Sequence, residues 1–104
     1  MIYARPLQVD VEPGAPVVVR PHGDVDANCA DALRETLLAQ VRASDVALDL
    51  SAVGFIDSPG VSVLVTAHRT ACAAGHRFAI RGADGVVLKV LHAMGLEQVL
   101  PLER

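Results

Sequence analysis

The stretch that decides the fold opens with Val46-Ala-Leu-Asp-Leu50, passes through Ser51-Ala-Val-Gly-Phe-Ile56 and ends in Asp57-Ser-Pro-Gly60. Its first five residues are apolar and bounded by polar ones, a pattern typical of a buried strand. An amphipathic stretch follows directly, with apolar side chains at Val61 and Leu64. The sequence therefore predicts a strand, a polar turn and a helix in immediate succession.

The proline in the turn predicts where this helix begins. Proline disfavours the α conformation in the residue before it and suits the first helical position. We therefore expect Ser58 to be the N-cap and Pro59 the first helical residue, with the Ser58 hydroxyl facing the free N–H groups of Gly60 and Val61. A serine in that place is either a helix cap alone or an acceptor for a phosphate held by the helix end. Local physics does not choose between the two.

Composition sets the class of protein. The 104 residues are 52% hydrophobic and 20% charged, with a mean hydropathy of +0.40, so we expect one globular domain over residues 1–104. Because only 3% of the residues are aromatic, the core must be aliphatic. A net charge of −3 and a single lysine, Lys89, offer no electrostatic footprint for nucleic acid.

The chain also shows no signal sequence and no apolar run of membrane-spanning length, which predicts a cytoplasmic protein. Cys29 and Cys72 lack metal-type spacing, and we expect them to be buried free thiols of a reduced compartment. The four histidines form no zinc pattern.

Hydrophobic periodicity predicts the remaining elements. Strands are expected at 7–11, 17–20, 46–50, 77–81 and 97–100, and helices at 28–42, 59–74 and 86–94. Asn28 is expected to cap the first of these helices, and Gly75 to end the second. Strands that alternate with helices imply a mostly parallel sheet covered by helices, an α/β fold.

The stretch from Asp49 to Gly60 resembles the signature of the STAS domain, as found in bacterial anti-sigma factor antagonists. In that family an aspartate, a phosphorylatable serine, a small residue and a glycine precede a helix, and Asp57, Ser58 and Gly60 match them. The segment Gly23-Asp24-Val25-Asp26 is similar to an early loop of the family, and 87–96 to its penultimate helix with a Gly-Leu ending. Pro59 departs from the usual Ser, Thr or Ala, and removes one N–H from the donors around a phosphate.

The resemblance implies a STAS fold, with a mostly parallel or mixed sheet of about five strands. It also implies an anti-sigma factor antagonist that binds an anti-sigma factor serine kinase and is switched off by phosphorylation on Ser58. A phosphatase would restore it, and ATP would serve only as the partner's substrate, so no cofactor is expected. The implied partner-facing residues are Gly23, Asp24, Asp26, Asp57, Ser58, Pro59, Gly60 and Ser62.

Three alternatives compete with this interpretation. A hydrolase is disfavoured because the G-x-S-x-G pattern fails at Ile56, and no phosphate-binding or dinucleotide-binding motif is present. A receiver-like domain phosphorylated at Asp49 or Asp57 is disfavoured because Lys89 falls inside a helix pattern. A STAS accessory or scaffold subunit, of a lipid transporter or a stress complex, stays open.

Asp24 and Asp26 by themselves indicate helix caps and dipole partners more than a metal site.

Overall fold

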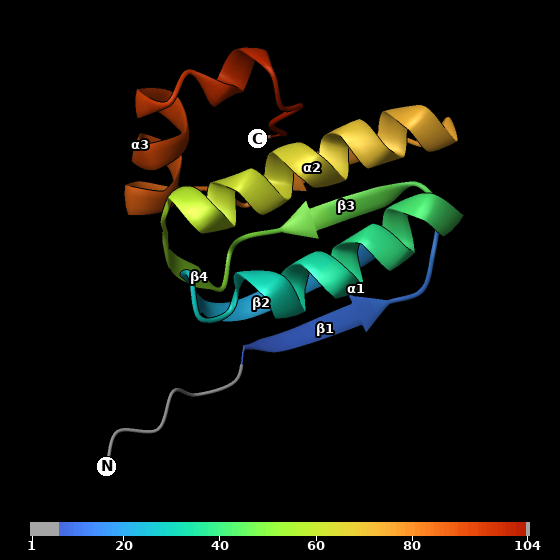
Figure 1. The fold of residues 1–104 in the computed structure, drawn as a ribbon, viewed down its shortest axis with the longest axis horizontal. Helices are drawn as coiled ribbons and strands as arrows, with labels where there is room; N and C mark the ends of the chain where they lie inside the picture. Colours follow the sequence, from blue (N-terminus) through green and yellow to red (C-terminus); the bar gives the residue numbers. More distant parts are fainter. Residues whose placement is uncertain (1–6, 104) are drawn as a thin grey trace.

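A hairpin of β1 (Gln8–Glu12) and β2 (Val17–Val25) begins the sheet in the structure, a computed structural model that describes residues 7–103 (Figure 1). β3 (Val46–Asp49) pairs parallel with the first half of β2, and β5 (Phe78–Arg81) pairs parallel with β3. β4 (Val53–Ile56) pairs parallel with the far end of β2. The predicted mixed sheet of five strands is confirmed.

Two long helices, α1 (Ala30–Ala43) and α2 (Ser58–Ala74), lie side by side on one face of the sheet (Figure 1). Each connects strands that run parallel to one another, so both helices run in the same direction and start at the carboxyl ends of the strands. A third helix, α3 (Gly85–Ala93), packs against β4 at that same end. The start of α2 is therefore surrounded by strand ends and loops.

The core is aliphatic, as expected. α1 buries the predicted stripe of Ala30, Leu33, Leu37 and Val41. Phe78 is the buried aromatic side chain among residues 7–103, and the largest of the fully buried side chains are all Leu, Ile or Val. No helix in this part of the chain is long and apolar enough to cross a bilayer.

The structure differs from the predicted strands in three places. β2 runs on to Val25, so Gly23 and Asp24 belong to a strand and not to a loop, and β4 was not expected at all. The strand expected at 97–100 is instead the short 3₁₀ helix η1 (Leu96–Gln98), because Gly95 turns the chain with φ 68° and Leu100 N–H donates back to Leu96 O. The chain reaches the sheet edge only at Leu102, which bridges to Ile80.

An ion-pair network crosses three strands on the face of the sheet opposite Val17 and Val19. Arg20 Nε lies 3.0 Å from Asp49 Oδ2, and Arg20 Nη1 lies 3.1 Å from Glu12 Oε1. Burial alone would raise the pKa of Asp49, but hydrogen bonds from Ser51 and Arg20 outweigh it and hold that pKa below its usual value. The network therefore ties β1, β2 and β3 together through charge.

Candidate functional site at the start of α2

The predicted site residues gather at the carboxyl edge of the sheet, where β2 and β4 end and α2 begins. Gly23 pairs with Val53 and Val25 with Ile56, and Gly23 N–H donates to Ala52 O at 3.0 Å. These contacts place the Gly23–Asp26 segment beside the Ser58 turn, although about thirty residues separate them in sequence. β4, which the sequence analysis missed, is the strand that joins the two segments.

Asp57, and not Ser58, is the N-cap of α2. The backbone of Asp57 is extended (φ −114°, ψ −174°), and its Oδ1 accepts a hydrogen bond from Gly60 N–H at 3.2 Å. Asp57 O accepts the first bond within the helix, from Val61 N–H at 2.8 Å. The prediction was off by one residue because aspartate caps a helix as well as serine does, and proline also fits within the first turn, where no N–H is needed.

Ser58 is consequently the first residue of α2, with an exposed side chain. The first four N–H groups of a helix have no acceptor inside the helix. At the start of α2 these positions are residues 57–60. Asp57 N–H donates to Val25 O at 3.3 Å, and Gly60 N–H donates to the Asp57 carboxylate. Pro59 has no N–H. Of these four positions, only Ser58 has an N–H without an acceptor among residues 7–103. Gly60 and Val61, which we expected to be free donors, are both occupied.

Gly60 is buried and allows a close approach between α2 and the strands. A Cβ atom on Gly60 would lie 2.6 Å from Val25 O and 2.8 Å from Ile56 Cγ1. Such distances are far inside van der Waals contact, so a side chain here would push the helix away from β2 and β4. Gly60 therefore sets the position of the Ser58 turn from inside the molecule.

Asp26 builds the turn that leads into α1. Its Oδ1 accepts from Asn28 N–H at 2.9 Å, and its carbonyl accepts from Cys29 N–H at 3.1 Å and Ala30 N–H at 2.9 Å. The predicted Asn28 cap is wrong: Cys29 holds the N-cap position and caps with no side-chain hydrogen bond to the described residues. The reason is that the Asp26 carboxylate and carbonyl already satisfy the donors of this turn.

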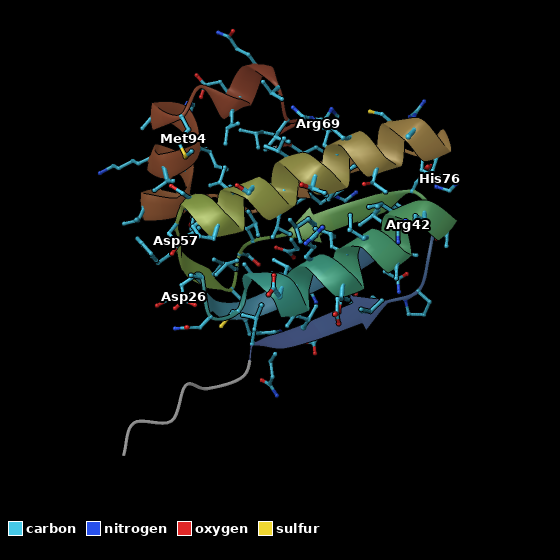
Figure 2. All side chains as sticks on the ribbon, in the orientation of Figure 1. Asp26, Arg42, Asp57, Arg69, His76 and Met94 are labelled. Carbon is cyan, nitrogen blue, oxygen red and sulfur yellow. The ribbon has the colours of Figure 1, made fainter. Side chains whose placement is uncertain are left out.

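The remaining predicted residues are on the surface. Gly23 and Asp24 are exposed at the end of β2, Pro59 and Ser62 are exposed on α2, and Asp57 and Asp26 are half-buried. Figure 2 shows Asp57 and Asp26 at the same end of the molecule, on the β4 side. Together with Asp24 they make this end acidic. No group of three or more His, Cys, Asp or Glu side chains among residues 7–103 is placed to hold a metal ion.

The two cysteines are free thiols, but neither is buried: Cys72 is exposed and Cys29 is intermediate. Partial burial raises the pKa of the Cys29 thiol, and the neighbouring Asp26 carboxylate raises it further. Cys72 follows His68 by one turn of α2, so the two side chains lie on the same side of the helix. Its Sγ lies 3.8 Å from His68 Nε2.

Comparison with known proteins identifies this architecture. The family model described as "Mlab, STAS domain" matches residues 9–102. The chain belongs to the STAS-domain family. A crystal structure of an anti-sigma factor antagonist from Mycobacterium paratuberculosis is 27% identical and superimposes with a TM-score of 0.83, over 92% of this chain and 84% of that one.

Two solved forms of SpoIIAA share the fold of this STAS domain. The unphosphorylated anti-sigma factor antagonist is 20% identical, with a TM-score of 0.74 over 94% of this chain and 88% of that one. The phosphorylated form of this Bacillus cell fate determinant is 19% identical, with a TM-score of 0.68 over 94% of this chain and 91% of that one. The resemblance seen at Asp57, Ser58 and Gly60 thus extends to the whole architecture.

Proposed function

We propose that this STAS domain is an anti-sigma factor antagonist: it binds an anti-sigma factor serine kinase and so releases a sigma factor. The exposure of Ser58, at an end of the molecule where the Gly23–Asp26 segment also reaches the surface, is the observation that carries the proposal. The likeness to the Mycobacterium paratuberculosis antagonist supports it. The chain would act by binding and not by catalysis, in the cytoplasm.

Phosphorylation of Ser58 by the bound kinase would switch the contact off. A phosphoserine adds about −1.5 to −2 charges at neutral pH. Pro59 has no N–H, and the Gly60 N–H is already bonded to Asp57. The N–H of Ser58 is then the one unoccupied donor at this helix end among the described residues, so a phosphate on Ser58 would be only partly neutralised and would present the rest of its charge to the partner, next to Asp57. Charge repulsion would then weaken the complex without unfolding the domain, and a phosphatase would reverse the change.

The direct test mixes the purified chain with the histidine-kinase-like anti-sigma factors of the same genome, with and without ATP and magnesium. Complex formation and phosphate transfer are read together, and the modified residue is mapped by mass spectrometry. We expect phosphate on Ser58 and loss of the complex once ATP is added. Ser58→Ala should stay bound with ATP present, and Ser58→Asp should bind poorly. Equal affinity of the Ala and Asp variants would contradict the switch.

Ser51→Ala is the matched control, because Ser51 is also exposed but lies in the turn between β3 and β4. This variant should retain both binding and phosphate transfer. Binding without transfer to Ser58 would instead indicate a constitutive antagonist, with Pro59 as the cause to test first.

A second candidate is an accessory or scaffold subunit with no sigma-factor role. The matching family model is described as "Mlab, STAS domain", which names no sigma factor and leaves this candidate open. The mixing experiment separates the two candidates: failure to bind any active anti-sigma kinase, together with capture of a transporter ATPase or a large scaffold protein, would support the second.

A further inference from the structure

The first turns of α1 and α2 enclose a surface groove that begins at the residue after Ser58. Its α1 side is lined by Ala30, Asp31 and Arg34, and its α2 side by Pro59, Ser62 and Val63. Ala30 and Val63 are buried and give the groove an apolar floor, whereas Asp31, Arg34 and Ser62 are exposed along its rim. The groove therefore has the layout of a small interface, with an apolar centre and a polar edge.

We propose that this groove receives a segment of the anti-sigma factor, which seats an apolar side chain on the floor and places a carboxylate against Arg34. The inference rests on the proposed function and deepens it, because it adds Ala30, Arg34 and Val63 to the partner-facing residues that the resemblance implies. Arg34 becomes the residue that selects which partner binds.

The position of the groove places it inside the area that a kinase must cover. A kinase that transfers phosphate to Ser58 has to close over the first turn of α2, and Pro59 in that turn already lines the groove. At 1.5 Å rise per residue, Ser58 and Thr66, another lining residue, are about 12 Å apart along the helix. An interface of standard size covers about 800 Å² per partner, a disc of about 16 Å radius. A partner centred on Ser58 therefore reaches the whole groove.

The charge of the groove points to the chemistry of the segment that fills it. Asp31 and Arg34, one acidic and one basic, are the charged residues among those that line the groove. No carboxylate among residues 7–103 lies within 4.0 Å of the Arg34 guanidinium. Guanidinium binds carboxylate through two parallel hydrogen bonds, which gives a pair both strength and orientation. The matching feature on the partner is therefore an acidic residue beside an apolar one.

The test measures affinity for the kinase that binds in the mixing experiment, without ATP so that no phosphate is transferred. Arg34→Glu should raise Kd about tenfold or more, and should lower the association rate most at low salt. Arg42→Glu is the matched control, because Arg42 is an exposed arginine two turns further along α1 and outside the groove. It should leave Kd within about twofold of the parent.

A second pair of variants tests the floor. Ser62→Trp fills the groove from its exposed rim and should also raise Kd about tenfold or more. Ala73→Trp adds the same side chain to an exposed site near the end of α2 and should have little effect. Thermal unfolding followed by circular dichroism checks that all four variants fold.

The outcomes separate this inference from the proposed function. If the parent chain binds a kinase and both groove variants bind as tightly as their controls, the groove is not the docking site although the antagonist role stands. If the parent binds no active anti-sigma kinase, the proposed function fails and the groove assignment fails with it. A loss in both Arg34→Glu and Ser62→Trp supports the inference, and the loss in Arg34→Glu decides it, because Ser62 already belongs to the partner-facing residues that the resemblance implies.

Discussion

The Asp57 carboxylate accepts a hydrogen bond from Gly60 N–H, with Oδ1 and N 3.2 Å apart, and so takes the backbone donor that a phosphate on Ser58 would otherwise use. The same carboxylate fixes the first turn of α2, and the Asp57 N–H anchors that turn to Val25 O. One aspartate thus holds the helix start in place and leaves the adjacent serine on the surface with little backbone support for a second negative charge.

Replacing the cap should destabilise the domain, whereas replacing the serine should not. We expect Asp57→Ala to lower the free energy of unfolding by about 1 kcal/mol, the usual cost of losing an N-cap side chain. Ser58→Ala should change it by less than about 0.5 kcal/mol, because Ser58 is exposed and is not the cap. Equilibrium urea unfolding of both variants measures the difference. A larger cost for Ser58→Ala would reverse the cap assignment.

Pro59 should control how a phosphate on Ser58 is stabilised. In Pro59→Ala the second helical position regains an N–H, which gives the phosphate a backbone donor. We therefore expect the second phosphate pKa of a protein carrying genetically encoded phosphoserine at 58 to be lower in Pro59→Ala than in the parent, as measured by ³¹P NMR titration. Because the ³¹P NMR titration needs no kinase, it isolates the effect of Pro59 on the phosphate. An unchanged titration would show that the missing N–H is irrelevant.

Gly60 should tolerate no side chain. The Cβ of Gly60→Ala would lie 2.6 Å from Val25 O, so α2 must shift away from β2, and we expect a loss of about 1–3 kcal/mol of stability. Gly54→Ala is the matched control, because its Cβ would meet only the Asp24 side chain, at 3.4 Å. Urea unfolding should show a clearly smaller loss for Gly54→Ala. Equal losses would mean that the close approach at Gly60 is not what restricts this position.

The sequence predicted the order of most elements because their periodicity is local. The α1 stripe and the Gly75 helix end follow from the spacing of apolar residues and from one glycine whose φ is 77°. β4 was missed because Val53-Gly-Phe-Ile56 contains a glycine and shows no apolar–polar alternation, and it becomes a strand through pairing with distant β2. A short segment without a periodic pattern of its own cannot be assigned without its partner strand.

The sequence predicted which residues form the candidate site, but it predicted the wrong N-cap, for a similar reason. The pattern Asp57-Ser58-Pro59 permits either of its first two residues to cap, and only the contact of Asp57 N–H with Val25 O decides between them. The groove between α1 and α2 joins Arg34 to Pro59, residues 25 positions apart, and nothing in the local sequence indicates that they meet. Tertiary packing supplies that information.

Asp49 should make stability depend on pH in the acid range. Hydrogen bonds from Ser51 and Arg20 hold the pKa of folded Asp49 below its usual value despite partial burial. Because the folded pKa is the lower one, the contribution is fully present above about pH 4 and is lost as the pH falls further. Asp49→Asn should lower stability by about 1 kcal/mol at pH 7 and flatten the decline of stability between about pH 4 and pH 2. Urea unfolding across that range measures the slope. Arg20→Met should flatten the decline of stability only in part, because the hydrogen bonds from Ser51 to Asp49 stay. If the decline were as steep in Asp49→Asn as in the parent, this carboxylate would not be linked to folding.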